Sequence, residues 1–245
     1  MESKAEMTNK NSICAASGLI LATTLFTTHP AVAASTLTFT GFEYGSVDVN
    51  VATNPPVPAA AVTHANAGAF NANINGGPTF EAFCLDVWQF LSFNQGYSLG
   101  IGSDYTYRPS LVGYTTNAGT LTQGAIDNLS RLYTEAHSSI IGNATNSAAF
   151  QLSVWEIAYE TPNNYNLASG NFYSTGPAGV TSIATGWLTN LASYAPTYSV
   201  SGYVSESYQD VVVFSVPEPG TYAMMLAGLG LMGFVVRRRT GRNAA

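Results

Sequence analysis

Two segments of the chain carry side chains that could take part in a covalent reaction. Cys84 lies in the segment FCLD (83–86), and Gln151 lies 67 residues later in the segment FQLSVW (150–155). A cysteine thiolate is a good nucleophile and a good leaving group, so it can attack a carbonyl carbon and be displaced from it. A glutamine in an otherwise apolar segment is costly to bury unless its amide is hydrogen-bonded. Gln151 therefore needs a polar partner.

Cys84 is the only cysteine after residue 34, because Cys14 lies in the N-terminal segment. We expect that segment to be removed on export, which leaves Cys84 without an internal disulfide partner. Its thiol is then an inert buried group, half of an intermolecular bridge, or the reactant in a special chemistry.

The two segments resemble the motifs of the bacterial thioester domains of surface adhesins. Those motifs are a cysteine flanked by apolar or aromatic residues and a later apolar-Gln-x-x-apolar-Trp segment, which correspond here to Cys84 and to Phe150, Gln151, Val154 and Trp155. In that family the cysteine sulfur replaces ammonia on the glutamine side chain and forms an internal thioester. An amine or hydroxyl on a partner then attacks the thioester and leaves the protein bound through the glutamine. The reaction occurs once per molecule, so the resemblance implies adhesion and not an enzyme.

The positions of the residues around the pair also suggest roles for them. Phe83 and Trp155 would shield the bond from water. Asp86, on the same face of the expected strand as Cys84, or Tyr159 would orient the site or relay a proton. Amide N–H groups at the N-terminus of the helix that carries the glutamine would stabilise the oxyanion.

Two other functions fit the same residues. Cys84 is equally explained as a small buried apolar residue, and Gln151 as a satisfied core amide, in a non-reactive structural or polysaccharide-associated matrix protein. A cysteine hydrolase would require His64 or His137, the histidines beyond residue 34, and we expect His137 at the surface near the end of a helix. No metal or other cofactor is expected, since one cysteine and two separated histidines have no metal-ligand spacing.

The hydrophobic pattern predicts the strands that position these residues. An apolar stretch at 80–91 predicts a strand buried on both faces, with Cys84 in the interior. Alternating and short apolar segments predict further strands at 36–42, 47–51, 97–101, 104–108, 197–204 and 208–216, separated by loops that include 54–58 and 64–78.

A helical period replaces this alternation in the middle of the chain. It predicts one helix over 125–140, a second that begins with Asn146 or Ser147 as its cap and ends near residue 160, and a third over 183–194. The layout predicts one α+β domain, a β-sandwich or partial barrel with a helical insertion.

Both ends of the chain have the composition of targeting segments. Residues 1–34 contain Lys4 and Lys10, an apolar run at 13–26 and small residues at 31–34, the order of a secretion signal peptide, with Met7 as an alternative start. The folded domain is then expected over 35–215, followed by a tail over 216–245.

The tail has three consecutive parts. They are Pro217, Glu218 and Pro219, an apolar run at 222–236, and Arg237, Arg238 and Arg239. Fifteen helical residues rise about 22 Å, short of a hydrocarbon core of roughly 30 Å, but terminal arginines extend the reach of such a helix. We expect a short transmembrane helix at 222–236 with its arginines in the cytoplasm and the body outside the inner membrane.

The order of these parts resembles the PEP-CTERM sorting signal of Gram-negative bacteria. In that family an exosortase, a membrane cysteine transpeptidase, recognises the tail, and the substrates are associated with exopolysaccharide and biofilm. The resemblance implies cleavage near residues 217–219, transfer to another carrier, and a final location at the cell surface or in the extracellular matrix.

The charge of the body excludes one class of partner. Residues 35–216 contain eleven carboxylates, two arginines and no lysine, a net charge of about −9. A body of this charge is repelled by phosphate backbones, so we do not expect nucleic-acid binding.

Overall fold

The computed structural model describes residues 35–54, 64–117, 119–160, 164–216, 225 and 228–232. The predicted signal peptide, the Pro217 to Pro219 motif, the three arginines and most of the predicted transmembrane helix lie outside these residues. No helix within the described residues is long and apolar enough to cross a membrane, and the helix at 222–236 stays a prediction.

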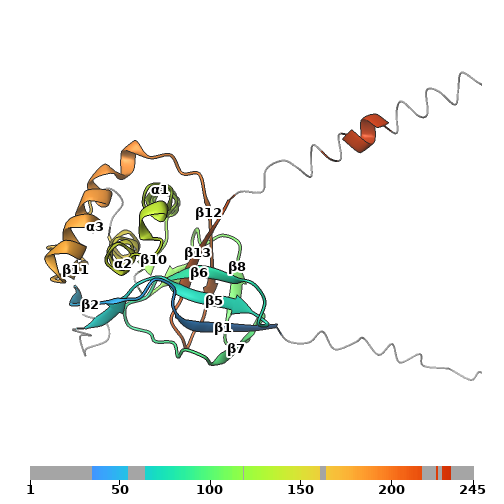
Figure 1. Cartoon of the computed structure of the whole chain (residues 1–245), viewed down its shortest axis with the longest axis horizontal. Helices are drawn as coiled ribbons and strands as arrows, with labels where there is room; N and C mark the ends of the chain where they lie inside the picture. Colours follow the sequence, from blue (N-terminus) through green and yellow to red (C-terminus); the bar gives the residue numbers. More distant parts are fainter. Residues whose placement is uncertain are drawn as a thin grey trace, which may run out of the picture. The chain divides into compact units, whose positions relative to one another are not determined.

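Seven strands form one antiparallel sheet in the order β7-β1-β5-β6-β13-β12-β8. They are β1 (Ser35–Phe42), β5 (Phe70–Ile74), β6 (Thr79–Cys84), β7 (Gly96–Leu99), β8 (Thr106–Arg108), β12 (Ser199–Val204) and β13 (Val211–Ser215). The edges meet where the Gly100 N–H donates to the Tyr105 carbonyl at 2.9 Å and the Tyr105 N–H donates to the Ser98 carbonyl at 3.0 Å. The sheet is therefore a nearly closed barrel, as the partial-barrel alternative predicted (Figure 1).

Short strand pairs flank the barrel. They are β2 (Val47–Val49) with β4 (Ala65–Ala67), β3 (Val51–Thr53) with β11 (Phe172–Ser174), and β9 (Thr115–Thr116) with β10 (Gly119–Thr120). The predicted strand at 47–51 is thus divided in two, because its halves pair with different partners.

Three helices lie together beside the barrel (Figure 1). They are α1 (Gln123–Ile140), α2 (Ala144–Tyr159) and α3 (Ala178–Asn190), the last continued by the short 3-10 helix η1 (Leu191–Ser193). α2 is apolar around most of its circumference and packs against α1, α3, β4 and β6. A helix that is apolar on all sides must be buried, so α2 occupies the centre of the helical layer.

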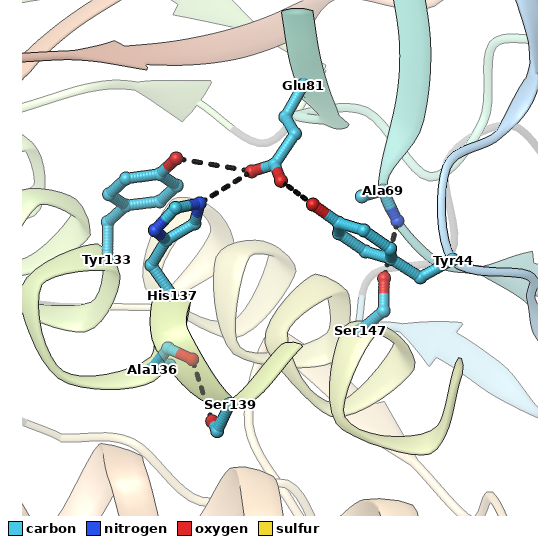
Figure 2. Close-up of polar contacts among 8 residues, drawn as sticks. All are labelled: Tyr44, Ala69, Glu81, Tyr133, Ala136, His137, Ser139 and Ser147. Carbon is cyan, nitrogen blue, oxygen red and sulfur yellow. Dashed lines mark hydrogen bonds and ion pairs between the residues drawn. The ribbon is translucent and has the colours of Figure 1, made fainter. Parts of the chain in front are cut away.

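A cluster of polar side chains connects α1 to the barrel (Figure 2). Glu81 of β6 accepts hydrogen bonds from the Tyr44 hydroxyl and, at 3.2 Å, from the Tyr133 hydroxyl, and its Oε2 lies 3.2 Å from His137 Nε2. The His137 ring stacks on Tyr133 with ring centres 4.4 Å apart. His137, predicted at the surface, is therefore partly buried by this contact.

Three boundaries differ from the predictions. The predicted strand at 80–91 ends at Cys84; residues 85–88 stay buried outside any strand, and Phe90 is 67 % exposed. The predicted loop at 64–78 contains β4 and β5, because pairing with β1, β2 and β6 outweighs a composition rich in Ala, Asn and Gly. Helix α2 begins at Ala144, since Asn143 provides the cap by accepting a hydrogen bond from the Asn146 N–H at 3.0 Å.

Candidate functional site

Cys84 is the last residue of β6 and is 3 % exposed. It pairs with Val211 of β13, and the N–H of the next residue, Leu85, donates to the Asp210 carbonyl at 2.8 Å. The cysteine is thus held in the interior by main-chain pairing, as the sequence predicted.

Gln151 is completely buried in the middle of α2. Its Oε1 accepts a hydrogen bond from the Cys84 N–H at 2.9 Å, and its Nε2 donates to the Cys84 carbonyl at 2.9 Å. The polar partner that a buried glutamine needs is therefore the main chain of Cys84. The structure brings together the two residues that the motif comparison paired.

This contact determines where the glutamine carbonyl carbon lies. Both polar atoms of the side-chain amide form hydrogen bonds with the main chain of Cys84. The carbonyl carbon Cδ of Gln151 therefore lies beside Cys84, whose Sγ is two covalent bonds from its Cα. The Cys84 N–H points to Oε1, the oxygen that gains negative charge when the carbonyl is attacked, so it can stabilise the oxyanion. The expected donors were N-terminal amides of the helix, but α2 begins at Ala144, well before Gln151.

The thiol of Cys84 is held in its neutral form. Burial raises the pKa of Cys84 well above its usual value, the negative charge of Asp86 raises it further, and a hydrogen bond with the Gln209 side chain lowers it. A neutral buried thiol is a poor nucleophile, so a reaction at Cys84 needs a group that accepts the proton.

Asp86 follows the end of the strand and is completely buried. Its Oδ1 accepts a hydrogen bond from the Asn117 N–H at 3.2 Å, and its Oδ2 accepts one from the Asp210 N–H at 2.9 Å. The expectation that Asp86 shares a strand face with Cys84 is wrong because β6 ends first. The residue is nevertheless close enough to Cys84 for its charge to raise the pKa of the thiol.

Asp86 and Asp210 form a buried carboxyl pair. Burial raises the pKa of both, and together with the charge of Asp86 it raises the pKa of Asp210 to about 8. Asp210 also accepts hydrogen bonds from the Ser205 N–H at 2.7 Å and the Tyr114 hydroxyl at 2.9 Å. At neutral pH the pair therefore retains a proton close to the thiol.

The cavity beside Cys84 has a volume of about 260 Å³. Its walls are mainly aromatic and aliphatic, formed by Phe42, Ala65, Phe70, Cys84, Val87, Phe90, Leu91, Phe93 and Trp155, together with the polar residues His64, Asn66 and Gln209. The sequence did not reveal this cavity because its aromatic residues come from separate segments that only the fold brings together.

Of the two residues predicted to shield the bond, one lines the cavity beside Cys84 and the other does not. Trp155 is 2 % exposed and lines the cavity, in the position of a shield. Phe83 is not one of the lining residues and packs instead against Phe150, with ring centres 4.4 Å apart. The hydroxyl of Tyr159 accepts a hydrogen bond from the Val87 N–H at 3.2 Å and so fixes the segment after Cys84.

The two histidines considered for a hydrolase are separated by the fold. His64 lines the cavity beside Cys84, whereas His137 lies in the Glu81 cluster. Within the described part of the chain, no group of three or more His, Cys, Asp or Glu side chains is placed to hold a metal ion.

Comparison with known families identifies the C-terminal segment. Residues 215–239 match the PEP-CTERM protein-sorting motif. This chain carries a PEP-CTERM sorting motif at its C-terminus. The motif implies processing by an exosortase, export, and sorting to the cell surface of a Gram-negative bacterium. The comparison with curated proteins found no match.

The body resembles two solved structures from Streptococcus pyogenes. One is the N-terminal domain of the pilus tip adhesin Cpa, with 14 % sequence identity, a TM-score of 0.40, and coverage of 71 % of this chain and 95 % of that chain. Another is the N-terminal thioester domain of the fibronectin-binding protein SfbI, with 15 % identity, a TM-score of 0.41, and the same coverage of 71 % and 95 %.

Proposed function

We propose that this exosortase-sorted protein attaches covalently to a partner at the cell surface or in the biofilm matrix through an internal thioester between Cys84 and Gln151. The observation that supports the proposal is the pair of 2.9 Å hydrogen bonds that hold the Gln151 amide against the main chain of Cys84. This contact places the carbonyl carbon of Gln151 beside the residue that carries the thiol.

The bond forms by exchange of sulfur for nitrogen. Sγ of Cys84 adds to Cδ of Gln151, the C–N bond breaks, and the nitrogen leaves as ammonia with the thiol proton. The Cys84 N–H stabilises the oxyanion during this exchange. The Asp86 and Asp210 pair, which holds a proton at neutral pH, relays the proton from the sulfur to the nitrogen.

The thioester is then used once. An amine or hydroxyl of the partner attacks Cδ, the C–S bond breaks, Cys84 regains a proton, and an amide or ester joins the partner to Gln151. The protein is consumed as an adhesin and does not turn over as an enzyme. The lack of lysine in residues 35–216 removes the commonest amine by which a neighbouring copy would compete.

The test is whether the Cys84 sulfur is labelled when the exported protein is unfolded in the presence of a thiol-reactive probe. We expect no labelling of the wild type, one label per chain after incubation of the folded protein with methylamine, and one label in Gln151→Ala without methylamine. If the untreated wild type labels like Gln151→Ala, Cys84 is a free thiol and the proposal is wrong.

Polysaccharide association is a second proposal, supported by a separate surface feature. A polar groove of about 590 Å³ lies between the β7–β8 and β12–β13 connections. Serine and threonine hydroxyls line it, and the Arg108 guanidinium lies 4.9 Å from the ring centre of Tyr114. Retention of Cys84→Ala on purified exopolysaccharide, and its loss in Cys84→Ala/Arg108→Ala, would support this binding. No retention of Cys84→Ala would contradict it.

A further inference from the structure

His64 shares the cavity beside Cys84 and is oriented by a carboxylate. Its Nδ1 lies 3.3 Å from Oδ2 of Asp48, and the two side chains are 67 % and 64 % exposed. An imidazole held at Nδ1 by a carboxylate has Nε2 available to accept a proton. The pair therefore has the arrangement of an oriented base beside the site of the proposed thioester.

The β2–β4 pair produces this arrangement. Asp48 lies in the middle of β2, opposite Asn66 of β4, and His64 directly precedes β4. Antiparallel pairing fixes both main chains, so the carboxylate and the imidazole meet at one end of the ribbon. Asn66 and Ala65, from the same ribbon, line the cavity together with His64.

The proposed reaction requires a base at this place. An amine that attacks the thioester must lose a proton as its C–N bond forms, and neither Asp86 nor Asp210 lines the cavity beside Cys84. Among the described residues that line the cavity, His64 and Cys84 have ionisable side chains. Asp48 faces the imidazole from β2.

We infer that His64, oriented by Asp48, is the base that activates the partner nucleophile. This inference rests on the proposed thioester. The nucleophile attacks Cδ of Gln151, its proton passes to Nε2 of His64, and the C–S bond breaks. The proton then passes from His64 to the Cys84 sulfur. The products are a new amide or ester at Gln151, a thiol at Cys84 and a neutral histidine.

Trp155 supplies an independent sign that the cavity accepts a polar group. The side chain is 2 % exposed and lines the cavity, and its Nε1 has no hydrogen-bond partner among the described residues. A buried N–H without a partner is unfavourable, and an incoming oxygen or nitrogen could relieve it.

The experiment measures two properties of the exported protein. The first is the resting mass of the wild type, His64→Ala, Asp48→Asn and the control His137→Ala. We expect all four to be lighter than calculated by one ammonia, because His64 acts after the thioester has formed. A wild type of the calculated mass would show that the thioester itself is absent, and both proposals would fail.

The second property is the rate of methylamine incorporation between about pH 5 and pH 8. In the wild type we expect the rate to rise with pH, because a base must be unprotonated to take the proton of the nucleophile. The rate should fall about 100-fold or more in His64→Ala and recover with added imidazole. It should fall less in Asp48→Asn, where the base remains but is not oriented, and stay unchanged in His137→Ala.

The inference would be overturned, with the thioester intact, by two results together. Asp48→Asn would have the rate and pH profile of the wild type, and His64→Ala would react as fast as the wild type. If His64→Ala fails to fold, the pH profile of Asp48→Asn decides: a reduced rate supports an oriented base, and an unchanged profile contradicts it.

Discussion

Asp86 and Asp210 place two carboxyl groups next to a neutral thiol, and they give the protein a distinctive dependence on pH. Burial raises the pKa of Asp210 to about 8, and burial also raises the pKa of Glu156 to about 8. The folded state therefore binds more protons than the unfolded state between the ordinary carboxyl pKa of about 4 and pH 8.

We expect the free energy of unfolding to fall as the pH rises from 5 to 8. The stabilisation from a raised carboxyl pKa is fully present below the unfolded pKa and is lost as the pH passes through the folded pKa. Asp210→Asn, which imitates the protonated form, should weaken this dependence, while the exposed Glu206→Gln should preserve it. Urea unfolding at several pH values measures the slope. Stability that rises from pH 5 to pH 8 would contradict the raised pKa values.

At the scale of elements, single polar contacts join the helical layer to the strands. The hydroxyl of Ser147, in the first turn of α2, accepts a hydrogen bond at 2.8 Å from the Ala69 N–H, next to β5 (Figure 2). Both residues are completely buried. This contact helps to hold α2 in the position from which Gln151 reaches Cys84.

Ser147→Ala should lower the free energy of unfolding by about 1–3 kcal/mol, because it leaves the buried Ala69 N–H without a partner. Ser139→Ala is the matched control: its hydroxyl donates to the Ala136 carbonyl at 2.7 Å in an exposed part of α1 (Figure 2). We expect that change to stay within about 0.5 kcal/mol. Similar stability losses in the two variants would show that the Ser147 contact has no special role.

The helices were more predictable than the strands. The apolar stripe of α1 and the continuous apolar face of α2 are local patterns, and they predicted both helices to within a few residues. The strands in 64–78 could not be predicted because their residues have weak strand preferences and depend on partners far along the chain. The predicted strand at 80–91 was too long because an apolar sequence does not show where sheet pairing stops.

The candidate site also has a part that the sequence predicted and a part that it did not. The sequence identified Cys84 and Gln151 because each lies in a recognisable local motif. It named His64 as one of two histidines that a hydrolase would need but did not place it beside the pair, since Asp48 and the cavity walls are distant in sequence and meet only through strand pairing. It also placed Gln151 close to the start of a helix, whereas α2 begins at Ala144, because the start of α2 depends on which of several asparagines provides the cap.

At the scale of the whole molecule, an acidic, lysine-free body is joined to a basic sorting tail. The match over 215–239 predicts that sorting depends on Pro217, Glu218 and Pro219. Replacing all three by alanine should leave the tail attached and the protein in the membrane fraction. Deletion of residues 241–245, outside the matched segment, should have no effect. Mass analysis of fractionated cells measures this, and normal processing of the triple variant would contradict the assignment.

The measurement that tests the central claim most directly is the intact mass of the exported protein beside Cys84→Ala and Gln151→Ala. The proposed thioester predicts that the wild type is lighter than calculated by one ammonia. Addition of methylamine should then give the N-methyl amide, which is heavier than calculated by one CH2 group. The thioester also predicts that both variants have their calculated masses. A wild type of the calculated mass with a free Cys84 thiol would contradict the thioester and leave Gln151 as a satisfied core amide.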